Sequence, residues 1–324
     1  MYRVLFLLFI LNLVFFSACK KDLLHWQHIQ KLNSSTTNNL YNVKFINDSI
    51  CIAAGGKIFE QSTVLRSTDG GYTWAFVPDP QIAAVGQAMF GMSVDPLGQI
   101  FLCGEYGDVL HSKDNGLTWQ YRRISNYLQY RGGVFPTPDT GIFVSTELYQ
   151  KCSITRVDSA FNIIDNQVFL FGLNNIYMTS PSVGYIIGYG TVMKTTDRGN
   201  VWNFQDVKGD NFMAMYIHGD EIWMCGFNGS VYHTINGGEH WDRLRNGNDI
   251  TIPHYNMRSI IFRDSSNGWI VCDDGKVLHS DDGGRHWAEY DRFTTDALRS
   301  IALCPNGDLL VAGDNGSLYR IIPK

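Results

Sequence analysis

Four aspartates and one asparagine recur at the same place in a repeated pattern, and they are the first residues to consider for chemistry. The pattern is Ser/Thr-x-Asp-x-Gly-x-x-Trp, at residues 67–74, 112–119, 195–202 and 280–287, and residues 234–241 keep it with Asn236 in the acidic place. An aspartate can act as a general acid or base, ligate Ca²⁺, or accept hydrogen bonds from the amides of a tight turn. Which role applies depends on how the repeats are arranged in space.

The spacing of these patterns defines a repeating unit. The tryptophans that end successive copies of the pattern lie 45, 39 and 46 residues apart in three intervals, and the remaining interval, between Trp119 and Trp202, spans 83 residues. A period of this size indicates a repeat architecture. The long interval predicts a degenerate copy at residues 153–161, in which Asp158 takes the acidic place, Phe161 replaces the tryptophan and the glycine is missing.

Each unit contains four short runs of β-forming residues, separated by turns rich in Gly, Asn and Asp. In the copy that contains residues 280–287, the runs are 258–262, 269–272, 276–279 and 287–290. Four hairpin-connected strands in a unit of this length are typical of a propeller blade. The eight-residue pattern, called a box below, is then the turn between the third and the fourth strand.

We predict an all-β fold, a single seven-bladed β-propeller of four-stranded blades over residues 24–324. Six complete blades are residues 41–77, 89–122, 131–167, 175–205, 212–244 and 255–290. The runs at 299–303, 309–312 and 317–321 supply three strands of the seventh blade, and the stretch at 24–29 supplies its fourth strand. Closure by this N-terminal strand removes sheet edges that would otherwise be exposed.

One box per blade makes the boxes structural in our interpretation. Their acidic groups are spread around the ring, so they cannot converge on one substrate. The Asp carboxylate or Asn carbonyl accepts hydrogen bonds from turn amides, the glycine permits a positive φ, and the tryptophan packs between blades. The residues assigned this role are Asp69, Trp74, Asp114, Trp119, Asp197, Trp202, Asn236, Trp241, Asp282 and Trp287.

The boxes resemble the Asp-box, or bacterial neuraminidase repeat, of sialidase-like propellers. The wider unit, an apolar pair and a glycine turn followed by the box, resembles the Ycf48/Hcf136-like family of seven-bladed propellers. The resemblance covers nearly all of residues 24–324 and implies the fold far more than an activity. In the plastid and cyanobacterial relatives such propellers assist assembly of a photosynthetic complex. Nothing in this sequence supports that task specifically, and the N-terminal lipoprotein signal described below favours another partner.

The face opposite the boxes carries the candidate binding residues, because the first strands begin there. The aligned position reads Tyr41, Phe90, Arg131, Asn175, Met213, Arg258 and Arg299. We expect Arg131, Arg258 and Arg299 to lie together and bind an anion or acidic sugar, since a guanidinium fits a carboxylate. Turns on the same face add Tyr106, Tyr189 and Phe227. In the other interpretation, each arginine pairs with a neighbouring aspartate or carbonyl.

The main functional interpretation is a non-catalytic binding or assembly propeller that engages a protein or glycan partner through this face. It assigns no catalytic residue, no metal ligand and no cofactor. The alternative is a sialidase-like or other glycoside-processing enzyme with an arginine-lined pocket. Tyr130, Tyr255, Glu105 and Asp274 are available for it, but the Arg-Ile-Pro signature of sialidases is absent. A third interpretation is a structural module in a polysaccharide-utilisation complex.

The N-terminus predicts a bacterial lipoprotein. Residues 4–16 form an apolar run of 13 residues after Arg3, which is the length of a signal peptide and too short for a spanning helix. Ser17 and Ala18 before Cys19 resemble a lipoprotein signal, although Phe16 stands where Leu is usual. We expect a signal peptide at 1–18, a lipidated Cys19, a tether at 19–23 and an outer-membrane location in the cell envelope. The other interpretations are an unmodified secreted protein and an uncleaved membrane anchor.

The net charge and the cysteines argue against nucleic-acid binding and against a disulfide or zinc framework. The net charge of −5 gives no reason to expect nucleic acid, whose binding needs Lys and Arg against phosphates. Beyond Cys19 the chain has an even number of cysteines, which would permit disulfides in an exported protein. However, Cys103, Cys225 and Cys272 end apolar strands where other copies have Ala, so we interpret them as small buried hydrophobes. None of the spacings resembles a zinc site.

Overall fold

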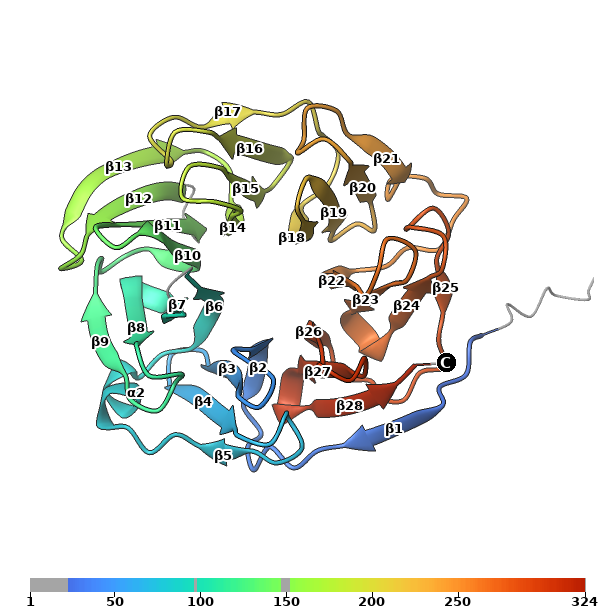
Figure 1. Cartoon of the computed structure of the whole chain (residues 1–324), viewed down its shortest axis with the longest axis horizontal. Helices are drawn as coiled ribbons and strands as arrows, with labels where there is room; N and C mark the ends of the chain where they lie inside the picture. Colours follow the sequence, from blue (N-terminus) through green and yellow to red (C-terminus); the bar gives the residue numbers. More distant parts are fainter. Residues whose placement is uncertain (1–22, 96–97, 147–151, 324) are drawn as a thin grey trace, which may run out of the picture.

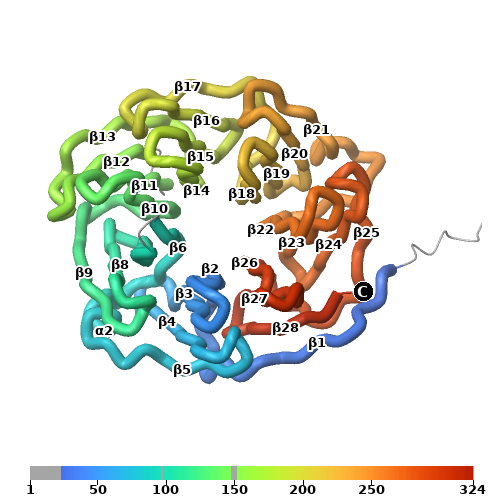
Figure 2. Tube along the Cα trace, viewed as in Figure 1, coloured from blue at the N-terminus to red at the C-terminus, as the bar shows by residue number. Residues whose placement is uncertain are grey.

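Seven four-stranded antiparallel sheets form a ring in the computed structural model, which describes residues 23–95, 98–146 and 152–323 (Figure 1). The chain passes from blade to blade in sequence order, as the colours in Figure 2 show. Within each blade the strands are hydrogen-bonded in the order first, second, third, fourth. The predicted seven-bladed all-β fold is confirmed. Among the described residues, no helix is long and apolar enough to cross a bilayer.

The strands of each blade follow the predicted units closely. The first strands, next to the axis, are β2 (Asn39–Phe45), β6 (Met89–Val94), β10 (Gln129–Thr137), β14 (Leu173–Met178), β18 (Phe212–His218), β22 (Met257–Phe262) and β26 (Leu298–Leu303). The second strands are β3 (Cys51–Lys57), β7 (Ile100–Gly104), β11 (Thr140–Thr146), β15 (Gly184–Gly188), β19 (Glu221–Gly226), β23 (Gly268–Cys272) and β27 (Leu309–Gly313).

The outer half of each blade is shorter. The third strands are β4 (Gln61–Ser67), β8 (Asp108–Ser112), β12 (Cys152–Asp158), β16 (Thr191–Thr195), β20 (Val231–Thr234), β24 (Val277–Ser280) and β28 (Leu318–Ile322). The fourth strands are β5 (Ala75–Phe76), β9 (Gln120–Arg123), β13 (Ile163–Phe169), β17 (Asn203–Phe204), β21 (Asp242–Arg245), β25 (Ala288–Glu289) and, from the N-terminus, β1 (His28–Lys31). A short helix, α2 (Pro80–Val85), links blades one and two and was not predicted.

The N-terminal strand closes the ring, but it begins later than predicted. β1 pairs antiparallel with β28, with Ile29 opposite Ile321, and covers residues 28–31 rather than 24–29. The preceding residues belong to blade six instead. Leu24 forms a parallel bridge with Tyr290, and the Trp26 ring stacks on the Tyr290 ring with centroids 3.6 Å apart.

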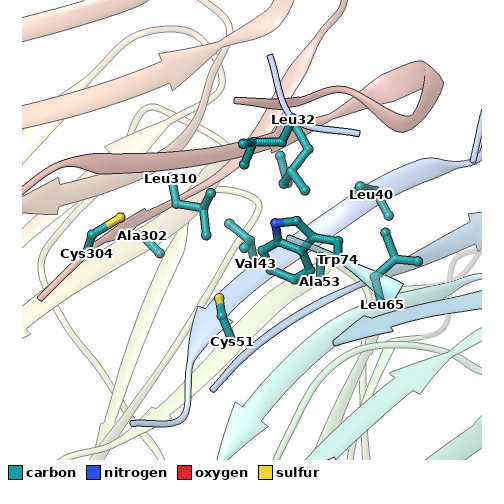
Figure 3. Packing of buried hydrophobic residues seen from close by; sticks show 12 residues of the cluster. Leu32, Leu40, Val43, Cys51, Ala53, Leu65, Trp74, Ala302, Cys304 and Leu310 are labelled. Carbon is teal, nitrogen blue, oxygen red and sulfur yellow. The ribbon is translucent and has the colours of Figure 1, made fainter. Parts of the chain in front are cut away.

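The seam between blade one and blade seven has its own apolar core. Figure 3 shows the box tryptophan Trp74 of blade one packed among Leu32 from the N-terminal segment, Leu310 from blade seven and Leu65 from β4. Leu32 and Leu65 are buried, and Trp74 is almost so. The N-terminal segment therefore stabilises the ring through side chains as well as through the β1 ladder.

All six cysteines of the described residues are buried and unpaired, as expected for small hydrophobes. Burial raises the pKa of Cys103 to about 12, so its thiol stays protonated. Cys103 and Cys225 occupy equivalent places, opposite Gly91 and Ala214. Cys272 was aligned with them but lies one residue further along its strand, opposite Met257.

Leu32→Ala tests the closure of the ring. Removing this buried side chain should lower the free energy of unfolding by about 2–4 kcal/mol, because it leaves a cavity beside Trp74 and Leu310. Gln30→Ala, on the exposed part of β1, is the matched control and should change it by less than about 0.5 kcal/mol. Denaturant titration of the two variants measures the difference. Equal effects would show that the N-terminal segment does not hold the seam.

Candidate functional site: the channel mouth

The box carboxylates are occupied by their own turns. Asp69 Oδ1 accepts hydrogen bonds from Ser67 Oγ at 2.8 Å, Tyr72 N at 3.1 Å and Thr73 N at 2.9 Å, while Oδ2 accepts from Thr73 Oγ1 at 2.6 Å. Trp74 Nε1 donates to the carbonyl of Gly71, whose φ of 86° is in the left-handed region. These hydrogen bonds stabilise the turn and leave the carboxylate oxygens few acceptor positions for a ligand.

The other boxes repeat this geometry. The aspartates of the other intact boxes accept hydrogen bonds from the hydroxyl two residues before them and from amides after them; these are Asp114, Asp197 and Asp282. Asn236 Oδ1 does the same with Thr234 and His240. In blade three Asp158 accepts from Ala160 N and Asn162 N, which identifies the degenerate copy. This geometry favours the structural interpretation of the boxes.

A β-bulge recurs at one position of every first strand. In β22 the ladder to β23 passes from Met257 to Ser259, so Arg258 is the extra residue. A bulge turns its extra side chain out of the regular pleat. The seven bulge residues are Tyr41, Phe90, Arg131, Asn174, Met213, Arg258 and Arg299. All seven line one central channel of about 810 Å³.

The predicted alignment of this ring is correct in six blades and wrong in blade four. The bulge residue there is Asn174, whereas Asn175 pairs with Ile187 in the ladder. Two consecutive asparagines fit the channel wall equally well by type, so composition could not separate them. The three predicted arginines do lie at one level of the channel.

A second ring, the turn positions, faces the bulge residues. In blade six, for example, Met257 precedes the bulge and pairs with Cys272, and the residue after Cys272 is the turn position, Asp273. The other blades follow the same rule. In blade order these residues are Gly56, Glu105, Thr146, Tyr189, Phe227, Asp273 and Asp314. The chemistry of the mouth therefore depends on which bulge residue meets which turn residue.

In blades six and seven the two positions form an ion pair. Arg258 donates to both carboxylate oxygens of Asp273 at 2.8 Å, and Arg299 donates to both oxygens of Asp314 at 2.8 and 2.6 Å. Arg299 Nη1 also lies 3.6 Å from Asp273. Two of the three predicted arginines are thus neutralised within the protein, and their planar forks are already filled.

Arg131 differs, because the turn position of blade three is Thr146 rather than an acid. Among the described residues its Nη2 donates to Gln129 Oε1 at 2.8 Å, and no carboxylate lies within ion-pair distance. Its guanidinium lies 4.2 Å from the centre of the Phe90 ring in blade two. Burial lowers the pKa of Arg131, but an arginine stays protonated at physiological pH.

The turn position of blade two, unlike that of blade three, is an acid. This residue, Glu105, is buried, and its Oε2 accepts a hydrogen bond from Phe59 N at 3.1 Å. Glu105 Oε1 has no hydrogen-bond partner among the described residues. Glu105 and Arg131 attract each other electrostatically across the blade boundary without touching. Among the described residues, Arg131 thus has no ion-pair partner, and Glu105 has one buried oxygen without a hydrogen bond.

Exposed aromatic side chains surround this region. Tyr106 is 40% exposed and Tyr189 is 68% exposed, as expected for a contact surface. Phe227 is instead half-buried, with the Arg258 guanidinium 4.5 Å above its ring, so it supports the ion pair. None of the three is part of the channel wall itself.

Sequence reasoning missed Phe59, which lies beside Tyr106. Phe59 is 57% exposed and its ring is 6.1 Å from that of Tyr106. Both residues have a positive φ, of 61° and 50°. Bulky side chains rarely adopt this conformation, and the strain of holding them there clusters at functional sites. The signal in the sequence was an apolar pair, Ile58 and Phe59, inside a hairpin turn.

The residues named for an enzyme do not assemble in the channel. Tyr130 is fully buried between blades two and three, and Tyr255 is buried with its hydroxyl 3.0 Å from Glu289. Neither lines the channel. In the described parts of the chain, no three His, Cys, Asp or Glu residues are grouped to hold a metal ion.

Comparison with known proteins agrees with this architecture. A family described as "Photosynthesis system II assembly factor YCF48" matches residues 159–253. The "Photosystem II assembly lipoprotein Ycf48" of Synechococcus sp. (strain CC9902) is 29% identical over 103 residues, which is 29% of this chain and 31% of that relative. The match thus spans about a third of the relative's length. This part of the chain is thus similar to Ycf48, and the whole described chain has a seven-bladed propeller fold.

Solved structures show the same fold over almost the whole chain. "YCF48 bound to D1 peptide" has a TM-score of 0.67 at 15% identity and covers 95% of this chain and 100% of its own. "YCF48 from Cyanidioschyzon merolae" has a TM-score of 0.68 at 15% identity, covering 91% and 98%. A lyase, "Streptogramin B lyase structure", scores 0.69 at 13% identity, covering 92% and 98%. Fold alone therefore does not separate binding from catalysis.

The box aspartates predict a specific acid response. Hydrogen bonds from His286 and Ser280 outweigh partial desolvation and lower the pKa of Asp282 to about 2. A lowered pKa stabilises the fold above the ordinary aspartate value of 3.8, and this stabilisation is lost as pH falls through about 2. Melting temperature should therefore fall between pH 4 and pH 2.

Asp282→Asn should make that fall shallower and should lower the melting temperature at pH 7, because the amide keeps one acceptor but no charge. Asp281→Asn, at the exposed adjacent position, is the control and should leave both unchanged. Thermal melts of the three proteins across this pH range provide the comparison. Identical pH profiles for all three would contradict the structural role of the box carboxylate.

The ion pairs predict that Arg258 supports the fold. Arg258→Ala removes two hydrogen bonds to Asp273 at a site where both side chains are about one-fifth exposed. The free energy of unfolding should fall by about 2 kcal/mol. Arg285→Ala, in an exposed box turn, should change it by less than about 0.5 kcal/mol. If the two variants have the same free energy of unfolding in denaturant titrations, the Arg258–Asp273 pair does not support the fold, and Arg258 is available to bind a ligand.

Proposed function

We propose that this protein is a non-catalytic docking or assembly propeller that binds a segment of a partner protein at the channel mouth. One observation carries the proposal: among the residues that the structure describes, Arg131 has no acidic partner of the kind that Arg258 and Arg299 have in the equivalent geometry. A carboxylate on the partner would complete the same two-pronged pair that the protein builds for itself in blades six and seven.

The aromatic side chains beside this mouth supply the apolar part of the contact. Phe59 and Tyr106 are held outward by strained backbone, so their exposure does not depend on a flexible loop. Large rigid aromatic groups contribute much of the affinity in protein interfaces. A partner segment with a carboxylate and an apolar side chain fits this arrangement better than a purely polar glycan does.

The Ycf48 resemblance supports the class of partner. One similar solved structure is described as bound to a D1 peptide, and the curated relative is described as an assembly lipoprotein. We carry over the kind of ligand, a peptide segment, and the kind of role, assembly. The particular partner of this chain is set by residues such as Thr146 and Phe59, whose chemistry is described above.

The glycosidase alternative finds little support in the mouth. Its arginine triad would need three free guanidinium groups, but Arg258 and Arg299 are bound to Asp273 and Asp314. Tyr255 does lie against a carboxylate, that of Glu289, yet this pair is buried away from the channel wall. A binding role uses the residues that the mouth actually exposes.

We also propose that the propeller is anchored to a membrane of the bacterial envelope, with the outer membrane as the expected location. Cys19 and the signal peptide at 1–18 lie outside the described residues. The word lipoprotein in the curated relative's description supports the anchor. Residues 24–31 run along the outside of blades six and seven, so this segment leaves the channel mouth uncovered (Figure 1).

Photo-crosslinking in the native envelope tests the binding face. A benzoylphenylalanine at position 59 should crosslink to a partner protein, whereas the same group at position 72 should not. Phe59 and Tyr72 are aromatic, lie in the same blade on opposite faces and are 57% and 50% exposed, so they form a matched pair. Equal crosslinking from both faces, or crosslinks to glycan alone, would contradict a protein-binding mouth.

Thr146→Asp tests the role of Arg131 within the same assay. The new carboxylate would take the place that Asp273 takes beside Arg258, so it should neutralise Arg131 and lower crosslinking from position 59 about tenfold. Arg131→Gln should have a similar effect. Thr146→Asn, which is uncharged, and Arg285→Gln, on the box face, should leave crosslinking unchanged. Full crosslinking by Thr146→Asp would mean that Arg131 does not bind the partner.

A further inference from the structure

The outer edge of blade three differs from that of every other blade. β13 is seven residues long, whereas β5, β17 and β25 have two residues each and β1, β9 and β21 have four. The four-residue strands each contain Lys or Arg, and short or positively charged edge strands resist pairing with another chain. β13 reads Ile-Ile-Asp-Asn-Gln-Val-Phe and contains no Lys, Arg or Pro. It is the unprotected edge of the ring.

β13 also exposes apolar side chains along its length. Ile163, Ile164 and Val168 are each more than half exposed, and Leu170, directly after the strand, is 86% exposed. Phe204, from the outer strand of blade four, is exposed close by, with its ring 6.0 Å from that of Phe171. Contiguous exposed apolar groups of this kind mark interaction surfaces.

One edge of β13 is paired, and no strand of the described residues pairs with the other. β12 pairs with it from Cys152 opposite Phe169 to Val157 opposite Ile163, with a bulge at Ile164. The sheet of blade three ends at β13. The outward backbone groups of β13 can therefore accept and donate hydrogen bonds to an added strand.

The order of side chains in β13 is self-complementary. Two apolar residues precede and two follow a polar centre of Asp165, Asn166 and Gln167. If two copies pair antiparallel with Asn166 opposite Asn166, Ile164 lies opposite Val168, and Asp165 lies opposite Gln167 rather than another acid. Cross-strand pairs of this kind stabilise a sheet, while like charges in opposition would destabilise it. Centring the pair on Gln167 would instead place Asp165 opposite Phe169.

We propose that a second copy of this chain occupies β13. The two strands pair antiparallel about a two-fold axis at Asn166, which joins two blades into one eight-stranded sheet. The same patch serves on both partners, as closed two-fold symmetry requires. A contact made by one strand is small, so the dimer is reversible and depends on concentration. Since blade three lies across the ring from Leu24, the N-terminal segment does not interfere (Figure 1).

Cysteine crosslinking in the full chain tests both the partner and the register. Asn166→Cys should form a disulfide-linked dimer under mild oxidation, because the two residues face each other across the axis. The native cysteines of the described residues are buried and should not compete. Gln120→Cys, equally exposed on the outer strand β9, is the matched control and should stay monomeric. When Ile164→Cys and Val168→Cys chains with different tags are expressed together, the mixed dimer should exceed either homodimer.

Val168→Lys supplies a second test on the Asn166→Cys background. The lysine places a charge opposite Ile164, and it does so twice because the interface is symmetric. The crosslinked fraction should therefore fall about tenfold. Crosslinking at position 166 no greater than at position 120, or insensitive to Val168→Lys, would overturn the proposal. Crosslinking of position 166 to a different protein would overturn the second copy as the occupant. The assay is independent of the channel mouth, and Thr146→Asp should not alter it.

Discussion

The ladder between β1 and β28 is the interaction on which the rest of the structure depends. Without it blade seven would have three strands and would leave the edge of β28 open to other chains. The same N-terminal segment places Leu32 in the core between the first and the last blade. Both ends of the chain are thereby tied together, and every other blade packs between two fixed neighbours. The channel and its mouth exist only because this seam closes.

The recurring bulge explains how one fold can hold different chemistry at its mouth. A bulge adds one residue to the first strand and shifts its register by one, while the ladder continues on both sides of the extra residue. The seven bulge residues can therefore vary from Met to Arg while the apolar faces between blades stay packed. The turn positions vary in the same way, from Gly to Asp. Binding properties are thus set by two residues per blade, largely independently of the interactions that stabilise the fold.

The sequence was sufficient for the blades because their signals are local and repeated. The box fixes the turn between the third and the fourth strand, so its spacing counted the blades even where Asp158 marks a degenerate copy. Exact register was harder, because a shift of one residue alters no composition. Asn174 and Asn175 illustrate this. The N-terminal strand is a second case: it was predicted at 24–29, but β1 is at 28–31 because Trp26 stacks on Tyr290 of blade six.

The contents of the mouth were less predictable, because they depend on pairs of residues that meet across a hairpin. Arg258 and Asp273 are 15 residues apart, as are Arg299 and Asp314, and this common offset was present in the sequence. At the same offset Arg131 meets Thr146, and Phe90 meets Glu105. Recognising that contrast required knowing where the bulges lie. The exposed turn at Phe59 was missed for a similar reason, since its apolar residues are also typical of a strand.

The separation of the Glu105 carboxylate from the Arg131 guanidinium between blades two and three supports the proposed binding of a partner at the mouth. Burial of Arg131 is unfavourable, and among the described residues Gln129, the Phe90 ring and the electrostatic attraction of Glu105 compensate for it only in part. An aspartate in place of Thr146 would remove this deficit with the geometry already used in two other blades. Within the described residues the complete pair is present twice and Arg131 has no such partner, so a destabilising group remains at the mouth. Such strain is stable only where the surrounding structure supports it, and it is useful only where a partner supplies the missing charge.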